Sequence, residues 1–166
     1  MRIAYVGGDF FANCAAALID QGHTISHIFD SGQSAFAVPV TIDDVARRCG
    51  VSPSREAMSS SDVAQLAGEV DVLVCAGYPH RIPIRESDAL RAINVHPSPL
   101  PFGRGPAPFQ RTILDGLSET AISIHQMVER FDFGPILLQV PVPVEDRDTT
   151  ASLAFRCRAA APGVLV

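Results

Sequence analysis

The sequence predicts an α/β fold: a mostly parallel, twisted, Rossmann-like sheet with helices on both faces. Two apolar runs rich in β-branched residues, 3–6 and 70–76, are typical of strands buried on both sides. Helical stretches separate the strands, and the first strand ends at Gly7-Gly8, which is a turn signal. Because strands that alternate with helices pair in parallel, these observations favour a doubly wound sheet.

In the N-terminal half, capping and stop signals define the helices. Gly22 stops the first helix, and Thr41 caps a helix with two acidic residues in its first turn, where the helix dipole favours anions. Ser60 or Ser61 caps the next helix. The expected elements are a strand over 3–6, a helix over 11–20, a strand over 24–29, a loop over 31–37, a helix from Thr41 through Cys49, and a helix ending at Gly68.

In the C-terminal half, the sequence ends with two alternating strands and a helix. Apolar and polar residues alternate over 120–128 and 136–144, with a tight connection at 131–134, so we expect a hairpin-like pair at one sheet edge. Either Pro162 and Gly163 end the last helix or the chain is shortened there. The other expected elements are a strand over 70–76, a short helix within 83–92, a strand over 92–96, a helix over 106–116, and the final helix from Thr149.

Length and composition predict one domain, residues 1–166, with a sizeable core. The formal charge is −5 and no cluster of Lys or Arg stands out, which argues against a chain that grips nucleic acid by itself. The N-terminus lacks a signal peptide, and no run approaches the roughly 20 apolar residues of a membrane helix. The four scattered cysteines suggest neither a zinc site nor a disulfide framework. We therefore expect a cytoplasmic protein.

The most informative stretch holds Asn94 and His96, two residues apart at the end of an apolar run. In a strand, both side chains project from the same face. The Pro-rich segment 97–101 cannot continue the strand and must form a shaped loop. Ligands of open α/β sheets bind beyond the carboxyl ends of the strands, so this pair marks a candidate site. An isolated Asn-x-His is more often structural, and here the neighbouring residues favour function.

Asp132 is the next candidate, because it lies between Phe131 and Phe133. An acid between two aromatic residues loses water on both sides and needs a partner or a shifted pKa. The structural alternative is a turn Asp that bonds its own backbone. Arg104, between two glycines, either holds an anionic substrate or braces the loop. His125 falls on an alternating strand and is predicted to be structural rather than a metal ligand.

Three segments together resemble a known family. They are I-N-V-H-P-S-P-L-P-F-G-R-G (93–105), T-A-I-S-I-H-Q-M-V (120–128) and F-D-F-G-P-I-L-L-Q (131–139). They resemble the catalytic domain of the formyltransferases that use 10-formyltetrahydrofolate. The resemblance runs from Met1 to the last helix and is dense from Val70 to Gln139. It implies an α/β catalytic domain, 10-formyltetrahydrofolate as co-substrate, no metal, and a cis Leu100–Pro101 bond.

Carried over residue by residue, the resemblance implies a set of site residues. The implied catalytic residues are Asn94, His96 and Asp132. The implied folate-binding residues are Tyr78, Arg81, Ile82, Pro83, Met127, Val128, Glu129 and Phe131. The apolar slot for the folate is expected from Tyr78, Ile82 and Phe131. The rigid Pro-rich loop is expected on the acceptor side, with substrate contacts from Ser98, Arg104 and Pro106.

The chemistry of formyl transfer fits these residue types. The acceptor amine attacks the formyl carbon, and an oxyanion develops on the formyl oxygen. Asn94 donates a neutral hydrogen bond to this oxygen, and a protonated His96 donates a charged one. Asp132 is expected to raise the pKa of His96, to orient its ring, and to accept the amine proton directly or through water.

Several functions compete at this stage. The leading hypothesis is formyl transfer to a small-molecule amine, such as an amino sugar, because the basic surface and extra domain of the tRNA-modifying members do not appear in the 166 residues. The alternatives are a catalytic fragment of a methionyl-tRNA formyltransferase, a 10-formyltetrahydrofolate hydrolase, and a folate-binding or partner-binding module without catalysis. A nicotinamide oxidoreductase is compatible with the fold alone, but Gly7-Gly8 lacks the G-x-G-x-x-G spacing. The oligomeric state is open.

Overall fold

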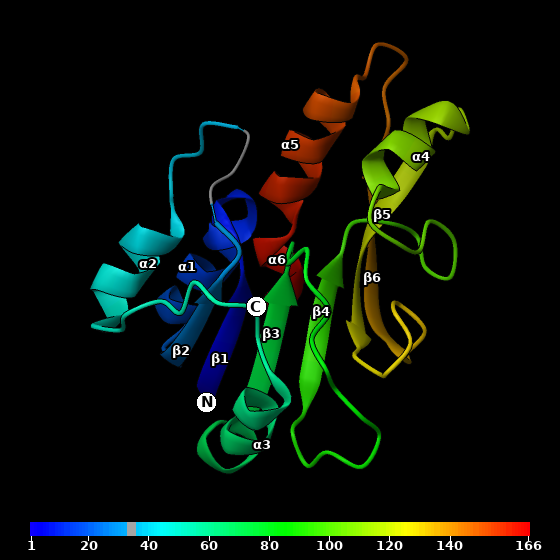
Figure 1. Cartoon of the computed structure of the whole chain (residues 1–166). Coiled ribbons are helices and arrows are strands. Elements are labelled where there is room, and N and C mark those ends of the chain that lie inside the picture. Colours follow the sequence, from blue (N-terminus) through cyan, green and yellow to red (C-terminus); the bar gives the residue numbers. More distant parts are fainter. Residues whose placement is uncertain (33–35) are drawn as a thin grey trace.

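The computed structural model describes residues 1–32 and 36–166, and within them the strands form one sheet in the order β2-β1-β3-β4-β5-β6 (Figure 1). β1 to β4 run parallel, β5 is antiparallel to β4, and β6 is antiparallel to β5. The strands are β1 (Arg2–Gly7), β2 (Thr24–Asp30), β3 (Val72–Ala76), β4 (Ala92–His96), β5 (Glu119–Gln126) and β6 (Ile136–Pro143). The mostly parallel sheet and the hairpin-like pair at its edge are both confirmed.

Helices cover both faces of the sheet, as the sequence predicts. One apolar cluster packs α1, α2, α5 and α6 against the sheet, and a second packs α3 and the segment that follows β3. The helical elements are the 3-10 helix η1 (Asp9–Phe11), α1 (Ala12–Asp20), α2 (Ile42–Cys49), α3 (Ser60–Glu69), α4 (Pro108–Leu114), α5 (Thr150–Ala160) and α6 (Pro162–Leu165). Cys14, Cys75 and Cys157 are buried free thiols in this core.

Three helices begin with reciprocal capping boxes, at Thr41, Ser59 and Thr149. The cap of α3 is Ser59 rather than Ser60 or Ser61, because a capping box needs its partner at the third helical position. Asp62 occupies that position, and its carboxylate accepts the backbone N–H of Ser59 at 2.7 Å. The acidic residue, rather than the run of serines, therefore decides where the helix begins.

The helix expected within 83–92 is absent from the structure, which has only a turn there. Ile82 and Ile84 are both buried on either side of Pro83, and the Ile84 N–H donates to the Ile82 carbonyl at 2.9 Å in a tight turn. Both side chains pack in the second apolar cluster. The sequence prediction was wrong because tertiary burial outweighed the local helical signal.

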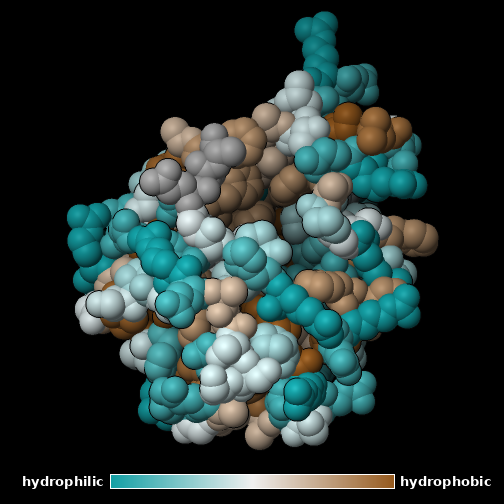
Figure 2. Space-filling view, viewed as in Figure 1, coloured by the Kyte–Doolittle hydropathy of each residue, from teal (hydrophilic) through white to brown (hydrophobic). Residues whose placement is uncertain are grey.

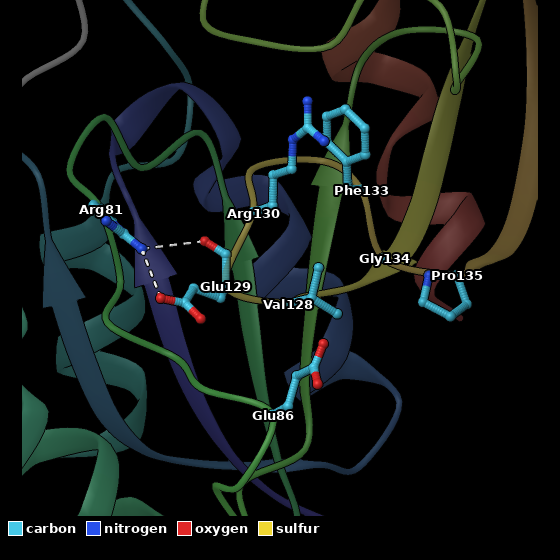
Figure 3. Close-up of a pocket in the computed structure, with 8 residues that line it drawn as sticks. All are labelled: Arg81, Glu86, Val128, Glu129, Arg130, Phe133, Gly134 and Pro135. Carbon is cyan, nitrogen blue, oxygen red and sulfur yellow. Dashed lines mark hydrogen bonds and ion pairs between the residues drawn. The ribbon is translucent and has the colours of Figure 1, made fainter.

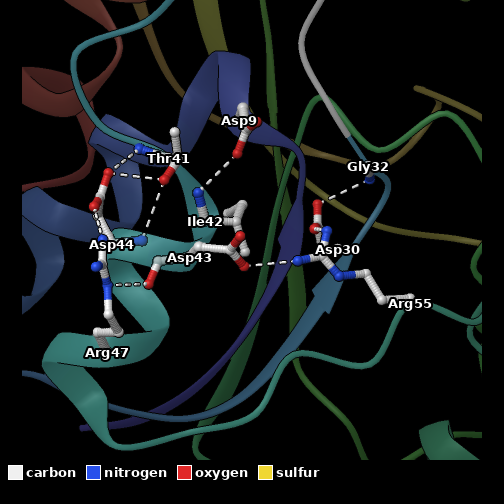
Figure 4. A network of polar contacts seen from close by, with 9 residues as sticks. All are labelled: Asp9, Asp30, Gly32, Thr41, Ile42, Asp43, Asp44, Arg47 and Arg55. Atoms are coloured by element: carbon white, nitrogen blue, oxygen red, sulfur yellow. Dashed lines mark hydrogen bonds and ion pairs between the residues drawn. The ribbon is translucent and has the colours of Figure 1, made fainter.

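A polar network holds α2 against the carboxyl ends of β1 and β2 (Figure 4). Asp30 is only 3% exposed, accepts the N–H of Gly32 at 2.9 Å, and pairs with Arg55. Arg55 also donates to Asp43 in the first turn of α2 at 2.6 Å. Asp9 accepts the first backbone N–H of α2 at 2.8 Å. Carboxylates and fixed cations thus anchor this end of the sheet.

The surface is mixed in polarity over most of the face shown in Figure 2, where hydrophobic atoms gather in a hollow in the upper half. The carboxyl ends of β1 and β3 point toward the same half in Figure 1. Phe10, Phe36 and Phe155 form an aromatic cluster that links η1, the segment after β2, and α5, with ring centroids 5.3–5.8 Å apart. The loop predicted over 31–37 includes residues outside the described part of the chain.

Candidate active site

The three predicted catalytic side chains converge. Asn94 and His96 project from the same face of β4, as their spacing predicts, and Asp132 comes from the connection between β5 and β6. The Asn94 Nδ2 atom lies 3.4 Å from Asp132 Oδ1, and His96 Nδ1 lies 3.8 Å from Asp132 Oδ2. His96 and Asp132 are 6% and 8% exposed. An amide, an imidazole and a carboxylate therefore meet in a nearly closed environment.

Asp132 is buried by other groups than its aromatic neighbours, which corrects the sequence prediction. Phe131 and Phe133 are 58% and 40% exposed, so their rings do not enclose the carboxylate. Instead, the backbone N–H of Gly105 donates to Asp132 Oδ2 at 2.9 Å, and Arg104 Nε donates to the Asp132 carbonyl at 2.9 Å. Its φ of 56° is the only positive value at a non-glycine residue among those described.

His125, which the sequence analysis predicts to be structural, also contacts two of the predicted catalytic residues. It faces Asn94 across the β4–β5 pair, is 2% exposed, and places Nε2 3.3 Å from Asp132 Oδ1 and 3.2 Å from Asn94 Nδ2. Its Nδ1 lies 2.9 Å from the carbonyl of Gln126, which can only accept a hydrogen bond. The signal that could have found it is the antiparallel register, because this register sets the alternating strand 120–128 directly opposite Asn94.

Burial dominates the electrostatics of His96. Desolvation lowers the pKa of His96 below its ordinary 6.5, although Asp132 and the hydrogen bond to the Gly103 carbonyl at 3.0 Å both act to raise it. The expected raised pKa is therefore wrong. Asp132 acts in the predicted direction but is outweighed by burial, so the ring is neutral at neutral pH in the ligand-free protein.

Asp132 stays ionised despite its burial. Desolvation alone would raise the pKa of Asp132, but the hydrogen bond with His125, the charge of His96 and the Gly105 N–H together lower that pKa below its ordinary 3.8. The site thus holds a carboxylate anion beside a neutral imidazole at neutral pH. Asp132 is therefore in the ionised form that can accept a proton, although its lowered pKa makes it a weak base.

A pocket of about 710 Å³ lies beside the site (Figure 3). Its lining residues are Arg81, Glu86, Val128, Glu129, Arg130, Phe133, Gly134 and Pro135. Arg81 Nη2 donates to the Glu129 carbonyl at 3.3 Å and lies 3.8 Å from the Glu129 carboxylate, which joins the two segments around the pocket. Arg81, Val128 and Glu129 are therefore brought together as expected.

The apolar slot expected from Tyr78, Ile82 and Phe131 is not found at this pocket. Ile82 is buried in the second apolar cluster, and the Tyr78 hydroxyl accepts the N–H of Met58 at 3.1 Å. Phe131 points into solvent. Met127 packs on the same cluster as Ile82, and Pro83 is half-buried outside the pocket lining. Charged side chains take up much of the lining instead.

The loop after β4 has internal contacts that account for its shape. Leu100–Pro101 is cis, as the resemblance implies. Ser98 is fully buried, and its hydroxyl donates to the Phe102 carbonyl at 2.9 Å, so it shapes the loop. Arg104 and Pro106, the other expected substrate contacts, are exposed. Of the two roles left open for Arg104, its bond to Asp132 supports the bracing role.

Gly134 permits the chain to pass close to β5. A Cβ atom built at this position would lie 1.8 Å from the Gln126 carbonyl oxygen, a distance that no side chain tolerates. The close approach directs the chain from Asp132 into β6. The position of the carboxylate therefore depends on a residue without a side chain two positions further on.

Neither a metal-binding cluster nor a membrane-spanning helix is found in residues 1–32 and 36–166. No group of three or more His, Cys, Asp or Glu side chains is arranged to hold a metal ion there. In the same part of the chain, no helix is both long and apolar enough to cross a bilayer.

The fold and the site define the class of α/β group-transfer enzymes. The chain belongs to the formyl transferase family, whose pattern matches residues 14–166. It is 30% identical over 178 residues to the methionyl-tRNA formyltransferase of Phenylobacterium zucineum, covering 100% of this chain and 58% of that protein. It is 33% identical over 164 residues to the enzyme of the same name from Bacillus mycoides, covering 92% and 52%. The chain thus spans about half the length of these relatives.

Solved structures agree with this assignment. Glycinamide ribonucleotide transformylase 1 from Symbiobacterium toebii superposes with a TM-score of 0.78 at 25% identity, covering 99% of this chain and 85% of that one. A formyltetrahydrofolate deformylase from Pseudomonas syringae superposes with a TM-score of 0.74 at 20% identity, covering 99% and 58%, and shows the shared fold alone.

Proposed function

We propose that this chain forms a single catalytic domain that transfers a formyl group from 10-formyltetrahydrofolate to an acceptor amine. The observation that carries the proposal is the convergence of Asn94, His96 and Asp132, with 3.4 and 3.8 Å between their polar atoms. The pocket of about 710 Å³ begins at Phe133 and Gly134, next to Asp132 in the chain, which supports binding of the donor beside these groups.

The reaction assigns a role to each side chain. The amine nitrogen forms a bond to the formyl carbon, and the bond from that carbon to the folate nitrogen breaks. Asn94 donates a hydrogen bond to the oxygen on which negative charge develops. His96 adds a second one only when its ring is protonated, because the Gly103 carbonyl already accepts its Nε2–H in the ligand-free protein. The ionised Asp132 accepts a proton from the attacking amine, and a proton returns to the leaving folate nitrogen. His125, which contacts both Asn94 and Asp132, keeps the two groups in register.

The pocket lining carries two arginines and two glutamates, and Arg81 already pairs with Glu129, so Arg130 is the guanidinium group without a carboxylate of the lining beside it in the contacts described. Arg81 and Arg130 contribute guanidinium groups to its lining. A guanidinium group binds carboxylates with two parallel hydrogen bonds, and the tail of a folate carries carboxylates. Arg81, Val128 and Glu129 are therefore proposed as donor-binding residues, and the exposed Phe131 is available as a neighbouring apolar contact.

The acceptor has two candidates. A small-molecule amine, such as an amino sugar, is the acceptor that the sequence predicts, and the net charge of −5 supports it. Methionyl-tRNA is the second candidate, because relatives of that printed activity are 30–33% identical over 92–100% of this chain. Both acceptors present a primary amine and need the same chemistry.

One assay tests the reaction and separates the acceptors. Release of tetrahydrofolate is followed with purified protein, 10-formyltetrahydrofolate, and either nucleotide-linked amino sugars or methionyl-tRNA. We expect turnover with one acceptor and its loss in His96→Ala and Asp132→Asn. Turnover near the wild-type level in both variants contradicts the proposal. Formate release without any acceptor would identify a hydrolase instead.

A further inference from the structure

Three consecutive residues after the Pro-rich loop contact both ionisable groups of the site. The Gly103 carbonyl accepts from His96 Nε2 at 3.0 Å. Arg104 Nε donates to the Asp132 carbonyl at 2.9 Å, and the Gly105 N–H donates to the Asp132 carboxylate at 2.9 Å. The backbone of this segment thus fixes the imidazole on one side and the carboxylate on the other. Arg104 is the one member that acts through its side chain.

Arg104 also packs on the residue that follows Asp132. Its Cζ lies 3.7 Å from the centroid of the Phe133 ring, and Arg130 Cζ lies 3.6 Å from the same centroid. Two guanidinium groups at these distances cannot both fit on the same face of the Phe133 ring, so the ring lies between them. Figure 3 shows Arg130 beside this ring. Such cation–π contacts are attractive, because the guanidinium charge faces the electron-rich face of the ring. The two arginines share a ring, but only Arg104 bonds to Asp132.

Asp132 needs such support because of its backbone. A φ of 56° lies in the left-handed region, which residues with a Cβ atom adopt less readily than glycine. The Gly105 N–H fixes the carboxylate, and the N–H of the peptide that follows Asp132 donates to the Arg130 carbonyl at 3.3 Å, so the Asp132 carbonyl is the group that Arg104 can hold. Arg104 fixes that peptide, because it holds the carbonyl of Asp132 and the ring of Phe133 together.

We propose that Arg104 is a positioning residue, which holds Asp132 in its left-handed backbone conformation so that the carboxylate faces His96 and Asn94. This inference rests on the proposed function, since it assigns the residue to the same site. It differs from the expected role of Arg104 as a ligand of an anionic substrate. In that role its charge would matter, whereas in the proposed role its Nε hydrogen bond matters.

Three variants separate these roles. Arg104→Ala removes the bond and the stacking, whereas Arg104→Lys keeps the charge but cannot donate from the Nε position. Arg130→Ala removes the matched stacking partner and one cation of the donor pocket. For both Arg104 variants we expect kcat to fall by about 10–100-fold, with KM for donor and acceptor changed less than about 3-fold. Arg130→Ala is expected to raise KM for the donor.

A readout without turnover keeps this test independent of the proposed function. Carboxyl NMR of Asp132 is recorded against pH in the wild type and the three variants. We expect the pKa of Asp132 to rise in Arg104→Ala and Arg104→Lys, because the carboxylate moves away from Gly105 and His125, and to be unchanged in Arg130→Ala. Phe133→Leu, which keeps the hydrogen bond, gives a smaller shift and serves if Arg104→Ala does not fold.

The outcomes are distinct. A wild-type protein without turnover overturns the proposed function, while the NMR titration still tests Arg104. An unchanged titration of Asp132 in both Arg104 variants overturns the positioning role. A higher KM for the acceptor at unchanged kcat, restored in Arg104→Lys, also overturns it, because that pattern belongs to a substrate-binding cation.

Discussion

Two buried carboxylates, Asp30 at the end of β2 and Asp132 in the candidate site, have similar surroundings but different partners. They are 3% and 8% exposed, and each accepts one backbone N–H at 2.9 Å. Asp30 pairs with Arg55, whose charge is permanent. Asp132 faces His96 and His125, whose imidazole rings, unlike a guanidinium group, carry no permanent charge.

The difference shows how one fold uses the same side chain in two ways. A buried carboxylate that pairs with a permanently charged guanidinium group contributes to the structure. A carboxylate beside imidazoles and an amide can take up a proton, because its partners do not fix its state. Burial alone therefore does not identify a candidate catalytic acid or base. The chemical type of the group that the carboxylate pairs with is the more informative observation.

The largest expected effect comes from exchanging the two carboxylates for amides. Asp132→Asn keeps the size of the side chain but removes the proton acceptor, so we expect turnover to fall by about 10²–10⁴-fold. Asp30→Asn is the matched control, in which stability falls and turnover of the folded protein persists. Steady-state kinetics and urea unfolding of both variants check this. Equal losses of turnover would remove the distinction between the sites.

Breaking the fixed-charge pair should affect stability next most strongly. Arg55→Ala leaves Asp30 buried without its cation, and we expect the free energy of unfolding to fall by about 2 kcal/mol, below the usual cost for buried pairs because the Arg55 side chain is 52% exposed. Arg111→Ala, which breaks the exposed Arg111–Asp115 pair on α4, is the control with about 0.5 kcal/mol or less. An equal change in both variants would show that the burial of Asp30 contributes nothing.

The pH dependence of stability should separate the imidazole from the carboxylate. The pKa of His96 is below 6.5 in the folded protein, so below pH 6.5 the unfolded chain binds a proton that the folded chain does not, and stability falls as the pH falls. The pKa of Asp132 is below 3.8 when folded, so its contribution is present above pH 3.8 and is lost as the pH falls through the lower folded value.

Urea unfolding of the wild type and His96→Gln checks these two ranges. We expect the variant to lose the slope that begins at pH 6.5, which is at most about 1.4 kcal/mol per pH unit for one proton, and to keep the slope below pH 3.8. An unchanged slope in the upper range would mean that His96 is not the group that titrates there.

The smallest expected effect concerns the outer partner of Arg55. The side chain of Asp43 is 67% exposed, so water screens its pair with Arg55. We therefore expect Asp43→Asn to lower the free energy of unfolding by less than about 1 kcal/mol. A double-mutant cycle with Arg55→Ala measures the coupling. A coupling as large as that between Arg55 and Asp30 would show that solvent does not screen this pair.

The sequence predicted the sheet, its two faces and the convergence of Asn94, His96 and Asp132, because these follow from periodicity, from strand ends and from motifs. It did not predict that His125 contacts Asn94, since its place opposite Asn94 depends on the register between two strands that are far apart in the chain. It also misjudged the pKa of His96. The nearest carboxylate can be guessed from a motif, but the burial that outweighs it is a property of the whole fold.

The predicted apolar slot agrees least with the packing in the structure. The sequence suggested an apolar slot, because Tyr78, Ile82 and Phe131 are apolar or aromatic residues near the expected site. The structure uses Ile82 in the core and leaves Phe131 exposed, while Arg81 and Glu129 meet at the pocket. Which side of a loop faces a cavity is set by tertiary packing, so residue type alone did not decide it.

The close approach at Gly134 limits which residues can occupy position 134. A library with all residues at position 134 should return glycine alone from a screen for folded product, since even a methyl group meets a carbonyl oxygen at 1.8 Å. The same library at Gly163, where no atom lies within 4 Å of an added Cβ, should return many residues. One codon next to the reacting groups is thus closed to variation for steric reasons, although its residue takes no part in the chemistry.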